Sequence, residues 1–376
     1  MNQRWLKCAL VTVILCGSAN TASAQFYVSG MLAMVARNAD VANQHNRTNA
    51  GFSTFDATYG RVFFDGRVTD RLSAFVQLYL GMNYSPFVNG AYIRYDHSEK
   101  WHLEAGLIPL PVGLWGPRTY PDKNPLVGVP LMYQYKTGLM VNNGLQQTPE
   151  EILSQRGTSQ AVPIVYDFCW NTGIHGYGSV GPFDFGLALQ TGSLGSPSRE
   201  ITYDYPNVQA HISWVPGPGL TIGGWAATGA YLGPAVESQL PAGQTLEDYH
   251  QQTIGGLAHA AQGHWDIFAE ALFNRFQHPF LGDLDATGGY LDVRYGFAPK
   301  WFGAVRIEGM TFSRFARSID PQERYWEYPL ARLEFGLGHR MTHKTMLKAV
   351  TQIVRFDHAP SAKDEEIYAL QFVAEI

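Results

Sequence analysis

The sequence has little charge for its length, a single cysteine beyond its N-terminal region and no long apolar run in its later part. Charged residues make up 16% of the 376 residues, whereas aromatic residues reach 13%. No segment after residue 24 offers the roughly eighteen unbroken apolar residues of a membrane helix. Cys169 has no second cysteine within residues 25–376, so a disulfide framework is excluded. Such a composition is explained if the apolar surface is spread over alternating strands.

Residues 1–24 have the pattern of an export signal. Arg4 and Lys7 precede an apolar run of ten residues, 8–17, and small residues at 21–24 suit a signal peptidase. The run is too short to cross a bilayer core of about 30 Å, so we expect a cleaved signal peptide rather than an anchor. Cleavage leaves 25 basic residues against 32 acidic ones, which argues against a nucleic-acid partner.

After Gln25, segments of about ten residues alternate between apolar and polar positions, which is typical of β-strands. In the segment 301–309, Trp301, Val305 and Ile307 fall on one face, and Arg306 and Glu308 fall on the other. The same arrangement recurs at 62–68, 92–96, 266–274, 291–295 and 330–335. Each strand is therefore expected to be apolar on one side and charged on the other.

Tight and longer connections alternate along the chain. The tight ones lie at 69–71, 97–100, 181–182, 216–219, 263–264, 299–300 and 342–344. The longer ones lie at 37–57, 83–88, 109–168, 193–205, 230–250, 276–285, 313–326 and 358–365. This alternation predicts an all-β fold, a transmembrane antiparallel up-and-down β-barrel of about sixteen strands that occupies residues 25–376 as one domain. A soluble β-sandwich or propeller would explain the strands but not the alternation.

Both the turns and the C-terminus indicate a membrane barrel. Trp101, Phe183, Trp265 and Trp301 follow short turns, where an aromatic girdle would meet the periplasmic side of the bilayer. Alternate residues of 368–376 are apolar, as in the last strand of an outer-membrane barrel. We therefore expect the exported chain to lie in a bacterial outer membrane, in contact with its lipid.

The connection 109–168, the third long loop, is far too long for a simple hairpin. Six prolines stiffen its first part, and Thr148–Glu151 predicts a capped helix start followed by a short helix through residues 154–156. The loop either folds into the lumen or caps its mouth, and its stiffness favours a constriction inside. Its charged residues, which largely cancel, are Arg118, Asp122, Lys123, Lys136, Glu150, Glu151, Arg156 and Asp167.

The segments 89–95 and 103–114 resemble the phosphate-selective porin O and P family, in which a similar strand leads into the third loop. The resemblance covers about 30 residues and implies a sixteen-stranded porin with a constriction loop, assembled as a homotrimer. The lysine that the family carries before the proline pair is missing, because residues 108–111 are wholly apolar. We therefore carry over the porin fold and the constriction loop but not phosphate selectivity.

Charged positions opposite the apolar faces are expected to line a water-filled lumen, since a charge facing lipid at mid-bilayer costs about 2–4 kcal/mol for Arg or Lys. These pore-lining candidates are Arg61, Asp65, Arg67, Arg94, Asp96, Glu104, Glu270, Asp292, Arg294, Arg306, Glu308, Arg332 and Glu334. His102, Asp184, His211, Asp266 and Lys348 fall on the same faces. The mixed signs are compatible either with a conducting lumen or with cross-strand pairs that merely fill it.

The favoured interpretation is a porin that allows passive diffusion of small hydrophilic solutes or ions. One alternative is a non-conducting structural or partner-binding barrel, a sheath or an adhesin. Another is an outer-membrane hydrolase, which has little support because the sequence contains no G-x-S-x-G motif. His339 and His343 flank a predicted turn rather than a helix, so neither a metal site nor a cofactor is expected.

Overall fold

The computed structural model describes residues 25–38, 58–81, 86–157, 161–166, 170–197, 203–316, 323–357 and 365–376. The expected signal peptide 1–24, Cys169 and Asp167 lie outside these ranges. So do most of the expected loops 37–57 and 358–365, and part of 83–88.

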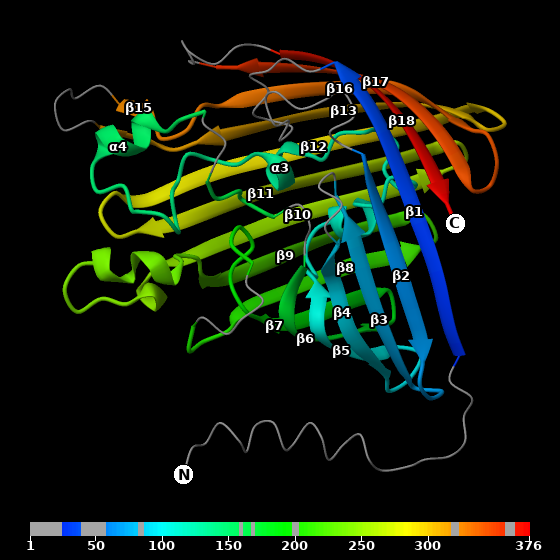
Figure 1. Cartoon of the computed structure of the whole chain (residues 1–376), viewed down its shortest axis with the longest axis horizontal. Coiled ribbons are helices and arrows are strands. Elements are labelled where there is room, and N and C mark those ends of the chain that lie inside the picture. Colours follow the sequence, from blue (N-terminus) through cyan, green and yellow to red (C-terminus); the bar gives the residue numbers. More distant parts are fainter. Residues whose placement is uncertain are drawn as a thin grey trace.

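Sixteen antiparallel strands of the described chain close into a barrel in which each strand pairs with its neighbours along the sequence (Figure 1). They are β1 (Gln25–Asn38), β2 (Tyr59–Arg67), β3 (Leu72–Leu80), β4 (Pro86–Asp96), β5 (Trp101–Pro109), β6 (Trp170–Val180), β7 (Phe183–Gln190), β8 (Asn207–Gly217), β9 (Leu220–Ala230), β10 (His250–Gln262), β11 (Trp265–His278), β12 (Gly282–Ala298), β13 (Trp301–Phe312), β16 (Leu330–Arg340), β17 (Thr345–Phe356) and β18 (Glu365–Glu375). Met31 of β1 lies opposite Arg61 of β2 on one side and Glu375 of β18 on the other, which closes the sheet. The expected fold class is confirmed.

The connections follow the expected alternation with one exception. The segment 276–285, expected to be a long loop, belongs mostly to β11 and β12, which only residues 279–281 join. Arg275 lies opposite Asp285 in the ladder, and its Nε is 2.7 Å from the carboxylate. Phe276 and Leu284 are fully buried inside the barrel, so the strand pattern continues through a segment that looked irregular.

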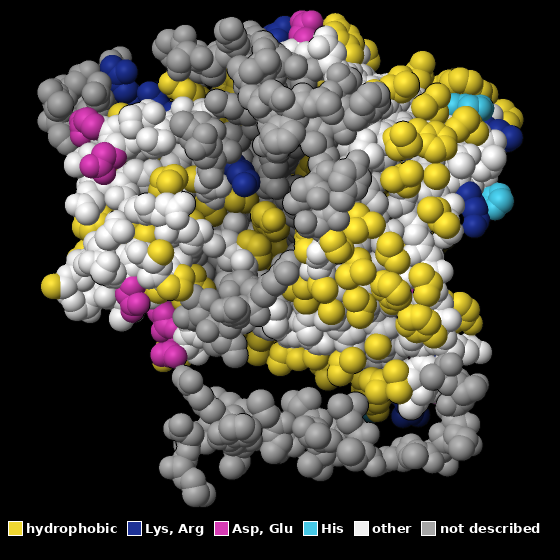
Figure 2. All heavy atoms as spheres, in the orientation of Figure 1, with side chains coloured by type: hydrophobic (Ala, Val, Ile, Leu, Met, Phe, Trp, Pro, Cys, Tyr) yellow, Lys and Arg dark blue, Asp and Glu magenta, His cyan; other side chains and the backbone are white. Residues whose placement is uncertain are grey.

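The outer wall is apolar. Ile307, Leu337 and Leu187 are each more than half exposed, and the expected girdle residues Trp101, Phe183, Trp265 and Trp301 are 43–49% exposed. Figure 2 shows hydrophobic side chains spread over the visible strands, with most visible charges near the two ends of the barrel. An apolar belt outside and charged positions inside are what a barrel needs in lipid. No helix among the described residues is long and apolar enough to cross a membrane.

The remaining elements lie in the long connections. Three short helices, α2 (Trp115–Arg118), α3 (Leu131–Gln134) and α4 (Pro149–Ser154), lie in residues 110–169, which we call the inner loop. The 3-10 turns η1 (Pro234–Gln239) and η2 (Leu246–Asp248) follow β9, and the two-stranded sheet β14 (Arg314–Ala316) and β15 (Glu323–Tyr325) follows β13. The α3 helix packs against β12 and β13, inside the barrel (Figure 1). Its Leu131, Met132 and Tyr133 are buried in one apolar cluster with wall residues such as Leu272 and Met310.

Candidate functional site

A buried ion pair ties the inner loop to the barrel wall. Arg306 of β13 is fully buried and holds both carboxylate oxygens of Asp292 on β12, with Nη2 at 2.9 Å from Oδ2. Arg118 of the inner loop pairs with the same carboxylate. Arg306 also donates to the carbonyl of Gly128 at 2.6 Å. Because an isolated buried charge is costly, these contacts compensate each other across the loop and the wall.

Two wall carboxylates accept hydrogen bonds from backbone N–H groups of the inner loop. Glu334 accepts from Val127 and Gly128 at 3.1 and 2.8 Å, and Glu308 accepts from Leu131 while pairing with Arg332. The loop therefore has the polar partners that its buried backbone needs.

Two further wall side chains, Glu270 and Lys348, hold the inner loop. With Asp292, Arg306, Glu308, Arg332 and Glu334 they form what we call the loop seat. Glu270 accepts from the Tyr133 hydroxyl at 2.8 Å and from the N–H of Leu114 at 3.2 Å. Lys348, also fully buried, donates to three carbonyls of the loop, those of residues 121, 124 and 126, at 2.8–2.9 Å. The favoured inward fold of the loop is thus what the structure contains.

This seat corrects part of the sequence interpretation. Seven pore-lining candidates point into the barrel as expected but lie beneath the inner loop, at most 5% exposed, rather than facing open water; they are Arg61, Glu270, Asp292, Arg306, Glu308, Arg332 and Glu334. The strand pattern reveals which face of a strand is inside, but it does not reveal which part of the lumen the loop covers.

The charged residues of the inner loop serve different purposes. Arg118 belongs to the buried seat, whereas Lys123 is 66% exposed and pairs with Asp122 at 2.7 Å. Thr148 and Glu151 form the expected capping box of α4, and Glu150 lies in its first turn. The helix ends at Ser154, slightly earlier than expected, and Arg156 lies over the Tyr328 ring at 4.4 Å. Lys136 lines a cavity described below.

A second anchor of the loop lies outside the barrel strands. Glu327, on the connection between β15 and β16, is fully buried and accepts from the N–H groups of Gly138 and Gly157 at 2.7 and 2.8 Å. Burial raises the pKa of this carboxyl to about 7, although these hydrogen bonds oppose the shift. The outer part of the inner loop is therefore held by a group that titrates near neutrality.

The candidates on β4 and β5 lie on the other side of the lumen. Arg94 and Asp96 pair at 2.8 Å, and Asp96 also lies 2.6 Å from Nδ1 of His102. Glu104 accepts from the Tyr177 hydroxyl at 2.9 Å.

Arg61 of β2 contacts the inner loop, because it donates to the carbonyl of Thr119 at 3.3 Å. The remaining candidates are scattered. Asp65 and Arg67 are exposed near the short-turn end. Arg294 lines a separate cavity beside the turns 263–264 and 299–300.

Sequence reasoning missed a group of aromatic rings on the inner face of β2 to β6. Phe75 stacks on Trp170 with centroids 6.2 Å apart, and Tyr92 lies 5.2 Å from Phe75. Phe63 lies between Arg61 and Asp65 in sequence, so it shares their inward face, and its ring is 5.7 Å from that of Tyr120. The signal was present for Phe63 and Tyr92, since they occupy positions of the same parity as the charged residues of their strands.

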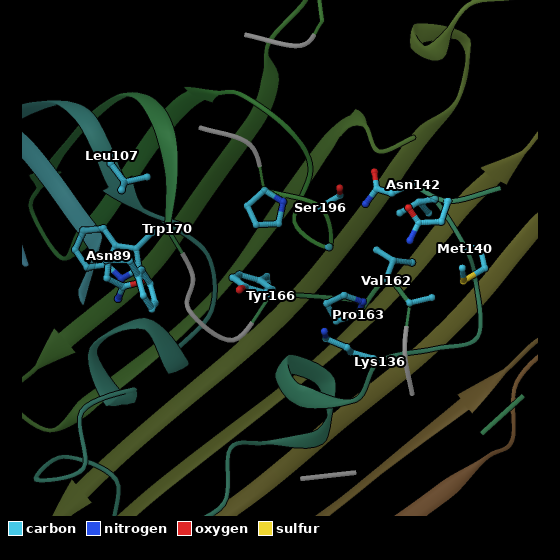
Figure 3. Close-up of a pocket in the computed structure, with 16 residues that line it drawn as sticks. Asn89, Leu107, Lys136, Met140, Asn142, Val162, Pro163, Tyr166, Trp170 and Ser196 are labelled. Atoms are coloured by element: carbon cyan, nitrogen blue, oxygen red, sulfur yellow. The ribbon is translucent and has the colours of Figure 1, made fainter. Parts of the chain in front are cut away.

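Two cavities lie between the inner loop and this aromatic wall. The outer cavity, of about 390 Å³, is lined by polar groups such as Asn89, Asn142 and Lys136, and by Tyr166 and Trp170 (Figure 3). The inner cavity, of about 670 Å³, extends from Trp170 past the inner loop towards β9 and β10. Trp170 contributes to both, so it stands where the two cavities approach each other.

Known structures share this fold at low sequence identity. An anion-selective porin from Comamonas acidovorans is 11% identical with a TM-score of 0.61, over 94% of this chain and 100% of that chain. The outer membrane channel DcaP of Acinetobacter baumannii is 11% identical with a TM-score of 0.59, over 96% and 100%. Salmonella typhi OmpF, in complex with daunomycin, is 10% identical with a TM-score of 0.55, over 93% and 97%. No family model and no curated protein sequence matches the chain. The similarity establishes a porin fold for this chain.

Proposed function

We propose that this protein is an outer-membrane porin through which small hydrophilic solutes or ions diffuse passively. The observation that carries the proposal is the uneven filling of the lumen. The inner loop covers the wall of β11 to β17, while two cavities lie between the loop and the wall of β3 to β10. A loop that narrows a barrel without being confined to its mouth is the arrangement expected of a constriction.

The solute path in this proposal runs along the aromatic wall, past the charged candidates that the loop leaves uncovered. Charges of opposite sign are paired there, as in Arg94 with Asp96, so neither sign dominates. Weak ion selectivity follows, and phosphate selectivity is not proposed. The proposed location is the bacterial outer membrane, reached through cleavage of residues 1–24. A homotrimer is proposed as the assembly, since OmpT of Vibrio cholerae has been described in a trimer form with the same fold.

Conductance of the purified mature chain in a planar bilayer tests the proposal. We expect stable, ohmic single-channel steps. A folded barrel, verified by circular dichroism and by its resistance to unfolding in cold detergent, that gives no steps would overturn the proposal. That result would favour the structural or partner-binding barrel instead.

A hydrolase is a weaker alternative for this barrel. Ser213, His211 and Asp184 all line the inner cavity, which brings together the residue types of a nucleophilic site. However, Nδ1 of His211 has no hydrogen-bond partner among the described residues, and no contact joins its ring to the Ser213 hydroxyl there. The described residues also contain no group of three metal-ligating side chains.

A further inference from the structure

The inner cavity has two facing walls of different chemistry. The inner loop, together with Pro109 at the end of β5, contributes proline and aliphatic side chains from the stretch 109–117, and the barrel contributes aromatic and histidine rings. Its volume of about 670 Å³ falls within the roughly 300–1,000 Å³ of small-molecule sites. A solute between these walls therefore meets apolar surface on both of its faces.

Trp170 and its neighbours form the first ring platform of the barrel wall. The indole stacks on Phe75 with an interplanar angle of 7°, and Tyr92 lies 6.2 Å from it. The indole lies so close to Gly90 that a Cβ at residue 90 would overlap it. The missing side chain of Gly90 therefore leaves room for the indole, and packing prevents the ring from rotating.

A second platform lies deeper in the cavity. Tyr177 stacks on His175 with centroids 4.7 Å apart, and the tilted ring of His102 lies 5.0 Å from it. Its hydroxyl donates to Glu104 at 2.9 Å, which fixes the position of the ring. His211 lies 5.8 Å from His175, so the rings continue around the wall to β8.

Polar side chains lie beside these rings. Ser213 of β8 and Asp184 of β7 line the same part of the cavity as His175 and His211. A ligand hydroxyl can donate to the Asp184 carboxylate, and it can donate to or accept from the Ser213 hydroxyl. The cavity therefore offers hydrogen-bond partners to a ligand with hydroxyl groups.

The side chains that line the inner cavity carry little charge, which favours a neutral ligand. None of the described residues that line it is Lys or Arg, and Asp184 is the one carboxylate among them. An anion would meet no cationic partner in this lining. A cation would find a single carboxylate beside mostly apolar surface.

We propose that the inner cavity is a binding site for a neutral pyranose sugar. The faces of the sugar ring, which carry C–H groups, stack between the aromatic platforms and the prolines of the inner loop. Its hydroxyl groups reach the side chains of Ser213 and Asp184, beside the rings of His175 and His211. The inference rests on the proposed porin function, because it names the class of solute that this path would favour.

Ion current through single channels of the mature protein tests the site, with D-glucose and sorbitol as probes. Sorbitol keeps the hydroxyl groups but has no ring, so it controls for viscosity and for hydrogen bonding alone. We expect glucose to reduce the current in a saturable way, whereas sorbitol should cause only a linear decrease. Equal effects of glucose and sorbitol on a conducting channel would overturn the sugar site and leave the porin standing. Saturable block by phenol but not by glucose would replace the sugar by an aromatic solute and also overturn the proposal.

Substitution of Trp170 links the effect to this cavity. Trp170→Ala should raise the half-saturating glucose concentration about fivefold, and Trp170→Phe should stay within about twofold of wild type, because one aromatic contact contributes about 1 kcal/mol. Trp301→Ala on the lipid-facing wall is the matched control and should leave the glucose effect unchanged. A Trp170→Ala channel with the wild-type glucose response would contradict the site.

Calorimetric titration of the detergent-solubilised barrel with glucose keeps the test independent of conductance. Binding of glucose but not of sorbitol is expected, and it should weaken in Trp170→Ala. If the barrel conducts no current, this titration still decides the proposal: no heat of glucose binding would overturn it.

Discussion

Asp292 compensates two arginines, Arg306 from the wall and Arg118 from the inner loop, in a site that is 1% exposed. Asp292→Asn keeps the size of the side chain but removes the charge between two buried guanidinium groups. Breaking a buried ion pair by removing one partner costs about 3–5 kcal/mol. The asparagine can still accept one hydrogen bond, so we expect a loss of about 3 kcal/mol in the free energy of unfolding. Much of this loss falls on the seat of the inner loop, and we expect less stable, noisier channel currents.

Urea unfolding followed by tryptophan fluorescence measures the loss, and single-channel recording measures the effect on the loop. Asp65→Asn is the matched control, because Asp65 lies on an inward face but is exposed; it should change stability by less than about 0.5 kcal/mol. Arg118→Met combined with Asp292→Asn should cost less than the two single changes together, since it removes one of the unpaired cations. Wild-type stability and quiet currents in Asp292→Asn would refute the view that this pair holds the loop.

Three further predictions concern pH, packing and selectivity. The pKa of Glu327 is about 7 in the folded barrel against an ordinary 4.5. Its favourable contribution to the free energy of unfolding is therefore complete below pH 4.5 and is lost as pH rises to 7. This contribution changes by up to about 3 kcal/mol, so proteolysis of the inner loop should be faster at pH 8 than at pH 5. Glu327→Gln should reduce the difference between the two rates. An unchanged pH dependence in the variant would contradict the role of Glu327. Gly90→Val should displace Trp170 and cost about 1–3 kcal/mol in urea unfolding, whereas Gly217→Ala, with open space around its Cβ position, should cost less than about 1 kcal/mol; equal costs would contradict the packing argument. The reversal potential in a salt gradient should lie close to zero, and a strong preference for phosphate would show that the balance of charges has been misjudged.

Local rules of the sequence predict much of the barrel. Arg306 and Glu308 alternate with Val305 and Ile307, and the structure places the first pair inside and the second pair outside. The helix start at Thr148 follows from the chemistry of its cap, and it is confirmed. These features depend on neighbours in sequence or on the period of a strand, so the sequence contains what they need.

The site depends on contacts between distant segments, and here sequence reasoning reached only part of the answer. The loop at 127–128 meets Glu334 across more than two hundred residues. No periodicity encodes that contact, which turns an expected pore-lining carboxylate into a buried partner of the backbone. The stretch 276–285 was misjudged for a different reason: its Gly, Pro and Asp residues look like a loop, but the pairing of Arg275 with Asp285 continues the ladder. The pairing between the two strands determined the structure of this stretch, although its composition is typical of a loop.

Thiol modification of single cysteines during current recording tests most directly whether solutes pass between the inner loop and the aromatic wall. In a Cys169→Ser background, Ser213→Cys places a thiol in the inner cavity, and Gln352→Cys places one on the wall beneath the loop, where residue 352 is 3% exposed. A cationic methanethiosulfonate should lower the current through the first variant and leave the second unchanged. Block at residue 352 without block at residue 213 would place the path on the opposite side of the lumen and contradict the proposed route.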